Sequence, residues 1–413
     1  MKLDKRDISI FKAFMIFISI WYLPGLFFSY YFDTYFSSYY AYDVFFSIKS
    51  FLFLVLFFFF FLLFFVFFFS TKSIKKYIFT PGFVKLFTFS VVLIFFLLSL
   101  YFNINYSYKF RHTSRLADSS FFVSLLWAIR PLVYIIFLSV LVVYLNGRLL
   151  SNFAKFFLFM MLVGAILSST STLQLIFPIL IFGVLFFPKI YLIKLFNIKI
   201  SNFFFFVFVF LLTISVVLFG VGGKVGYDNL FTENFLNVLS GYLDRLFPRL
   251  STSISSFLII SDAIYDSVFN YRYSDFFSVF YNRAALVFGF SDFDLDTIST
   301  VNRYNYLFVF ENHAERGGAS PGILASVFYF PFFPFGLIFL PLILSFILNQ
   351  IKKMTEKGFN LGFFGSITLL YPILNIFEAP LNIFYVFDPI FVMLFFLFFY
   401  TSFFDVNSAF SKG

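Results

Sequence analysis

Apolar runs of membrane-crossing length recur along this chain, and charged residues separate each run from the next. Two clear examples, 51–69 and 203–219, approach the roughly 20 residues that an α-helix needs to cross a hydrocarbon core. Only 12% of the residues are charged and the mean hydropathy is +0.95, whereas a soluble domain has about 25% charged residues. Uninterrupted Phe and Leu blocks also contradict the alternation of a β-barrel strand. The sequence therefore predicts an all-α, polytopic membrane helix bundle.

The apolar runs predict about ten transmembrane helices. Residues 156–187 form either two spans or one re-entrant hairpin, because both arms beside the Ser/Thr-rich turn at 168–172 are short. Helices 1–7 fall within 1–220 and helices 8–10 within 322–413, and between them 221–321 is a large polar loop, expected to carry amphipathic helices. The expected spans are 8–30, 44–69, 84–101, 121–144, 156–167, 173–187, 203–219, 322–348, 361–377 and 384–400.

Basic residues in the connections predict the side that each loop faces. With the N-terminus placed inside, every short inner connection is basic, as cytoplasmic loops are. The short outer connections around Asp33, at 168–172 and near Glu378 contain no Lys or Arg. Both termini are therefore expected in the cytoplasm, and the first span is expected to stay uncleaved. The inner basic residues are Lys2, Lys5, Arg6, Lys12, Lys72, Lys75, Lys76, Arg148, Lys155, Lys189, Lys194, Lys199, Lys352, Lys353, Lys357 and Lys412.

Arginine is concentrated in the two charged outer loops. Eight of the eleven arginines lie there, accompanied only by Lys109 and Lys224. Arginine binds phosphate through a planar two-point fork, whereas lysine acts as a point charge, so this face is expected to hold a phosphate or pyrophosphate. Alternatively, the eleven acidic residues between Asp228 and Glu315 pair with these arginines. The eight are Arg111, Arg115, Arg245, Arg249, Arg272, Arg283, Arg303 and Arg316.

Arg130 stands apart because it lies inside the fourth apolar run. An arginine at membrane depth is costly unless it is paired or hydrated, which makes it a candidate functional residue. Its expected intramembrane partners are Glu378 and Asp388, which flank the last outer turn. Two interpretations follow: a structural ion pair, or an outward-facing polar cavity in which Arg130 meets a lipid pyrophosphate.

The densest group of residues that can carry chemistry lies just before the eighth run. It consists of Glu311, His313, Glu315, Arg316, Gly317 and Gly318. The imidazole of His313 can exchange a proton near neutral pH, and the carboxylate of Glu311 or Glu315 can orient the imidazole or act as the base in its place. The glycines let backbone N–H groups approach an anion. The alternative is ordinary turn chemistry before a helix. No metal site is expected, because the chain has no Cys, only two His and no complete calcium-loop pattern. No cofactor is expected either, because the sequence contains no P-loop or dinucleotide-binding pattern.

This arrangement resembles the O-antigen polymerases of the Wzy type, which are bacterial inner-membrane proteins. The resemblance covers the architecture of nearly the whole chain: many spans, a large arginine-rich outer loop late in the chain, and a composition rich in phenylalanine. Its local part is 313–336, where the polar loop leads through Ser320, Pro321 and Gly322 into an apolar helix. The related O-antigen ligases share this plan and have a catalytic histidine near the end of the large loop, a role that corresponds to His313.

The resemblance implies glycosyl transfer on the periplasmic face of the inner membrane. Donor and acceptor would both be oligosaccharides linked to undecaprenyl pyrophosphate. Membrane lipids would be further partners and a chain-length regulator an optional protein partner, with no nucleic acid, cofactor or metal. The outer arginines would stabilise the departing pyrophosphate, where negative charge accumulates. His313, or Glu311 or Glu315 in its place, would take the proton of the acceptor hydroxyl.

Three alternatives stay open. An O-antigen ligase would transfer the finished glycan to lipid A core. A flippase or transporter for a lipid-linked oligosaccharide would place its charges in the membrane interior and often shows two repeated halves. A glycosyltransferase with a polyprenyl-phosphate sugar donor would use Asp33 or Asp43 as its base. The chain shows no internal repeat and concentrates its ionisable residues in one outer loop, which favours surface chemistry and therefore the polymerase.

Overall fold

The structure, a computed structural model, is all-α in the part of the chain that it describes. No β-strand occurs there, and extended backbone pairs only in isolated bridges. This confirms the predicted all-α class. The loop at 221–321 and nearly all of the expected span 203–219 lie outside the described residues, so the ten-span topology remains a prediction. The described residues are 5–32, 48–70, 78–106, 121–169, 172–193, 333–355, 362–371 and 389–412, with single positions at 207, 211, 214, 215, 218 and 237.

The described helices follow the predicted apolar runs in order. Helices α2, α3, α5 and α14 are long and apolar enough to cross a membrane, by length and composition and within the described residues alone. Helices α6, α7 and α17 are apolar but shorter. The bounds are α1 Lys5–Phe32, α2 Ile48–Ser70, α3 Pro81–Asn105, α5 Phe121–Leu145, α6 Asn152–Leu167, η2 Thr172–Leu175, α7 Ile176–Phe186, η3 Pro188–Leu192, α14 Phe333–Met354, α15 Phe363–Leu370, α17 Pro389–Phe403 and α18 Val406–Phe410.

Local sequence signals fix where several helices begin. Thr80 precedes α3 in extended backbone, its hydroxyl accepts the N–H of Phe83 at 3.4 Å, and a proline opens the helix. Proline suits this position because the first helical N–H has no partner within the helix. Ser151 caps α6 in the same way, accepting the N–H of Ala154 at 3.2 Å. Serine and threonine caps of this kind each stabilise a helix by about 1 kcal/mol.

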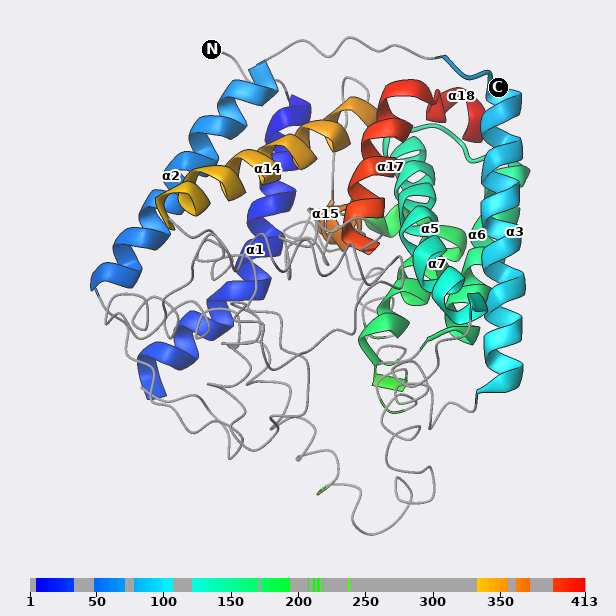
Figure 1. The fold of residues 1–413 in the computed structure, drawn as a ribbon, viewed down its shortest axis with the longest axis horizontal. Coiled ribbons are helices and arrows are strands. Elements are labelled where there is room, and N and C mark those ends of the chain that lie inside the picture. Colours follow the sequence, from blue (N-terminus) through cyan, green and yellow to red (C-terminus); the bar gives the residue numbers. More distant parts are fainter. Residues whose placement is uncertain are drawn as a thin grey trace, which may run out of the picture.

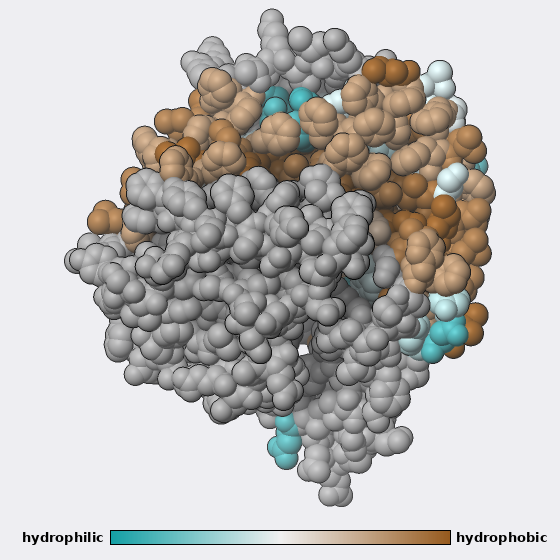
Figure 2. All heavy atoms as spheres, viewed as in Figure 1, coloured by the Kyte–Doolittle hydropathy of each residue, from teal (hydrophilic) through white to brown (hydrophobic). Residues whose placement is uncertain are grey.

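The helices form two groups that meet at α17 (Figure 1). Helix α14 packs on α2 and α1, while α3, α5, α6 and α7 pack together on the other side. Most of α5 is buried, whereas α2 is mainly exposed. Apolar residues cover most of the coloured surface in Figure 2, and only small hydrophilic areas interrupt them. An apolar surface this continuous is typical of helices that face lipid.

Consecutive residues of α17 join the two groups through buried polar contacts. The Tyr400 hydroxyl lies 3.2 Å from the Thr88 hydroxyl on α3. The next side chain, Thr401, donates to the amide oxygen of Gln350 on α14 at 3.1 Å. Hydrogen bonds between helices satisfy polar groups that lipid cannot. Helix α17 therefore connects α3 to α14 through two adjacent side chains.

Connections that the charge pattern predicts to be cytoplasmic meet at one end of the bundle. The N–H of Phe79, before α3, donates to the carbonyl of Phe403 at the end of α17 at 3.2 Å. The N–H of Ser151, between α5 and α6, donates to the carbonyl of Phe410 at 2.9 Å. Because the charge pattern places all of these segments on the same side, their proximity is what the predicted sidedness requires.

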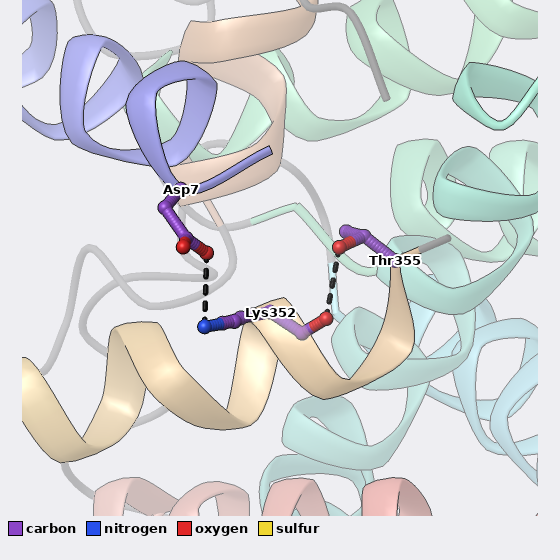
Figure 3. A network of polar contacts seen from close by, with 3 residues as sticks. All are labelled: Asp7, Lys352 and Thr355. Carbon is purple, nitrogen blue, oxygen red and sulfur yellow. Dashed lines mark hydrogen bonds and ion pairs between the residues drawn. The ribbon is translucent and has the colours of Figure 1, made fainter. Parts of the chain in front are cut away.

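A buried ion pair joins the beginning of α1 to the end of α14 (Figure 3). The Lys352 ammonium lies 3.0 Å from the Asp7 carboxylate, and each side chain is only 4% exposed. The carbonyl of Lys352 also accepts the Thr355 hydroxyl at 2.8 Å, which closes the end of the helix. Both charged residues belong to segments that the charge pattern treats as solvated cytoplasmic flanks. The structure instead buries them against each other.

We expect Lys352→Met to destabilise the protein strongly, because it leaves the Asp7 carboxylate buried without its ammonium. Breaking a buried pair by removing one partner typically costs about 3–5 kcal/mol, whereas replacing both partners with apolar residues is often neutral. The double variant Asp7→Leu, Lys352→Met should therefore recover most of the loss. Unfolding in detergent measures both, with Lys353→Met as the neighbouring control. Equal losses in the single and double variants would contradict a coupled pair.

Candidate functional site around Arg130

Arg130 lies well inside helix α5, which continues beyond it on both sides. It follows Phe121, the first residue of α5, by about 13 Å along the helix, and its side chain is only 8% exposed. Pro131 stands inside the helix and provides no N–H for the carbonyl of Trp127 one turn earlier. Trp127 and Arg130 are three residues apart, a spacing that places both side chains on one face of the helix.

The turn between α6 and α7 supplies the hydrogen-bond acceptors of Arg130. Nη1 donates to the amide oxygen of Gln174 at 2.9 Å. Nη2 donates to the carbonyl and to the hydroxyl of Ser168, each at 3.0 Å. That hydroxyl in turn donates to the carbonyl of Gly164 at 2.8 Å. A polar turn at the tip of an apolar hairpin is thus folded onto the only arginine of α5.

Trp127 supports the flat face of the guanidinium. The central carbon of Arg130 lies 4.3 Å from the centroid of the Trp127 ring, within the range of a cation–π contact. Phe102 of α3 meets the same indole edge-on, with ring centroids 6.4 Å apart. Stacking of this kind holds the plane of the guanidinium in one orientation.

Aromatic side chains from three segments line the neighbouring part of α5. Tyr134 lies one turn after Arg130, and its ring centroid is 4.5 Å from that of Phe177 on α7. Tyr371, directly after α15, stacks on Phe177 at 6.1 Å. The site therefore joins α5 and the α6–α7 hairpin to the C-terminal helices.

The charge of Arg130 has no counterion among the described residues. All of its hydrogen-bond acceptors there are neutral, and they accept from Nη1 and Nη2. A buried charge is normally paired with an opposite charge, because its burial without one is costly. The described residues therefore do not compensate the charge of Arg130. In contrast, no group of three or more His, Cys, Asp or Glu within the described ranges could hold a metal ion.

The hairpin tip is recessed relative to the beginning of α5. It contacts α5 at Arg130 rather than near Phe121. Helix α6 has 16 residues and α7 has 11, which correspond to about 24 Å and about 16 Å, both less than a hydrocarbon core of about 30 Å. The acceptors of Arg130 therefore lie alongside α5, about 13 Å from its first residue.

Among the predicted site residues, the structure describes Arg130 alone. It confirms that this arginine lies inside an apolar helix, and it supplies neutral acceptors where the sequence predicted carboxylates. Whether the predicted acidic partners approach it stays a prediction. The predicted residues outside the described part of the chain are Arg245, Arg249, Arg272, Arg283, Arg303, Glu311, His313, Glu315, Arg316, Gly317, Gly318, Glu378 and Asp388.

Sequence reasoning missed the partners of Arg130. Ser168 lies in the polar turn at 168–172 that the sequence identified only as a connection, and Gln174 follows it within an apolar run. A serine cluster between two apolar arms that are too short to span was the available signal. Trp127 could be found from its three-residue spacing to Arg130 on a predicted helix.

Comparisons with known proteins find no relative for this chain. No protein-family model matches it, and neither the curated proteins nor the solved structures contain a significant match. The functional argument therefore depends on the geometry of the site itself.

We expect Arg130→Met to leave stability unchanged or higher, because it removes a buried charge that lacks a counterion among the described residues. The Ser168 hydroxyl keeps its bond to Gly164 in that variant. Stability is often sacrificed at functional sites in this way. Unfolding in detergent measures the stability of this variant, and Arg148→Met, a substitution at an exposed arginine, is the control. A loss of about 3–5 kcal/mol, as for a broken buried ion pair, would show that Arg130 has a structural role.

Proposed function

We propose that this protein is a membrane glycosyltransferase of the O-antigen polymerase type. It joins oligosaccharide repeat units that are linked to undecaprenyl pyrophosphate, on the periplasmic face of a bacterial inner membrane. The observation that carries the proposal is Arg130: a buried guanidinium at membrane depth, held by neutral acceptors, with charge and donors left for an anion. The pyrophosphate of a lipid carrier is an anion that reaches this depth with its lipid attached.

In this proposal Arg130 acts on the leaving group. When the anomeric carbon of the donor is attacked, the bond to the pyrophosphate oxygen breaks and its electron pair remains on the pyrophosphate. A guanidinium whose plane is held by Trp127 would present its donors to that charge in a fixed orientation. The surrounding aromatic residues exclude water, which strengthens the interaction. No metal is needed for this step.

The base and further phosphate ligands of the proposal come from the large outer loop. His313, or Glu311 or Glu315, would take the proton of the acceptor hydroxyl while its oxygen forms the new bond to the anomeric carbon. The outer arginines would hold the second lipid-linked substrate. These roles rest on the sequence pattern and on the resemblance to O-antigen polymerases. The ligase stays an alternative because it would use the same leaving group with a different acceptor.

A carrier for a lipid-linked oligosaccharide is the second candidate, and one observation favours it. Arg130 lies inside the bundle, where a flippase places charges along its path. Transport and transfer would use the same anion site. They differ in the product that accumulates when the site is lost.

Lipopolysaccharide from a strain with the gene deleted separates these functions. We expect core carrying one repeat unit after deletion, a full ladder with the wild-type gene, and a single unit again with Arg130→Met. Arg130→Lys should also fail, because lysine lacks the two-point fork, whereas the exposed Arg148→Lys should restore the ladder. Core without any repeat would favour the ligase or the flippase. An unchanged ladder after deletion would contradict all three.

A further inference from the structure

Both hydrogens of Nη2 in Arg130 are already in use. One is donated to the carbonyl of Ser168 and the other to its hydroxyl, each at 3.0 Å. Nη1 gives one hydrogen to Gln174 at 2.9 Å. The donors without an acceptor among the described residues are therefore Nε and the second hydrogen of Nη1.

These remaining donors do not form a two-point edge. A guanidinium offers two such edges, one between Nη1 and Nη2 and one between Nη2 and Nε, because its five donors have a fixed fork geometry. Both edges include Nη2. An oxyanion that binds Arg130 in the strong two-point manner therefore competes with Ser168 for Nη2.

Ser168 has other hydrogen bonds that stay intact when it no longer contacts the guanidinium. Its hydroxyl donates to the carbonyl of Gly164 at 2.8 Å, and its backbone N–H donates to the same carbonyl at 3.0 Å. These bonds do not involve Arg130 and persist after release. Both acceptors on Ser168 are neutral, whereas an oxyanion carries a charge opposite to that of the guanidinium and can bind it at two points.

We propose that the tip of the α6–α7 hairpin is a latch on the anion site. Ser168 and Gln174 hold Arg130 until a phosphate or pyrophosphate group displaces Ser168 from Nη2. Anion binding is thereby coupled to a shift of the hairpin tip, and both residues are positioning residues that set the affinity of the site. The identity of the anion as a lipid pyrophosphate rests on the proposed function, whereas the latch requires only an oxyanion.

Trp127 provides a direct optical test. The chain has two tryptophans, so Trp21→Phe leaves Trp127 as the only one, 4.3 Å from the guanidinium. The full chain in detergent is titrated with inorganic pyrophosphate while Trp127 fluorescence is followed. We expect a saturable change that Arg130→Met abolishes. In Ser168→Ala the affinity should rise about tenfold or more, the factor for one hydrogen bond that involves a charged group.

Matched variants keep the test decisive. Ser139→Ala is the control. It removes a buried hydroxyl on α5 that donates to the carbonyl of Ile135 in the same helix, and it should leave the affinity unchanged. If Ser168→Ala does not fold, Ser168→Cys replaces the hydroxyl with a weaker acceptor of similar size and should raise the affinity in the same direction. Affinity that falls or stays constant when this acceptor is removed or weakened would overturn the latch.

The outcomes separate the latch from the proposed function. No pyrophosphate response in the wild-type background would overturn the anion site and the latch together. A response that depends on Arg130 but is unaffected by Ser168→Ala would overturn the latch alone. Undecaprenyl pyrophosphate added to the micelles should compete with the inorganic anion. Failure to compete would overturn the lipid-linked substrate and leave the latch standing.

Discussion

Burial of the Arg130 charge is the constraint on which the arrangement of the site depends. A guanidinium cannot be left undersolvated in a low-dielectric bundle, so neighbouring elements must bring polar atoms to it. The turn after α6 does so with Ser168 and Gln174, and Trp127 covers one face. The α6–α7 hairpin is drawn to a fixed level on α5 as a result. The same acceptors are neutral, so the described residues do not compensate the positive charge.

The described part of the chain contains two buried cations, Lys352 and Arg130, and their surroundings differ. Lys352 lies 3.0 Å from a carboxylate, Asp7, so its charge is compensated within the protein. Arg130 has neutral acceptors and no carboxylate among the described residues. The first arrangement ties α1 to α14 at the end where the predicted cytoplasmic connections meet. The second leaves the charge of Arg130 without a counterion among the described residues.

The sequence predicted the helical class because apolar runs and charge-rich connections are local properties of the chain. It identified Arg130 for the same reason, since a charge inside an apolar run is visible without any contact. It did not identify Ser168 or the pair of Asp7 and Lys352, because these partners are far apart in sequence: Ser168 follows Arg130 by 38 positions. Charge patterns describe which residues flank a span, and only packing decides which of them becomes buried.

Lipid that co-purifies with the protein tests the central claim most directly. Native mass spectrometry of the full chain, extracted in mild detergent from a bacterium that makes lipid-linked oligosaccharides, would detect a bound polyprenyl pyrophosphate. We predict that wild type and Arg148→Met carry such a lipid and that Arg130→Met loses it while remaining folded. The same lipid at the same occupancy in Arg130→Met, or no phosphorylated lipid on the wild type, would contradict an anion site at Arg130.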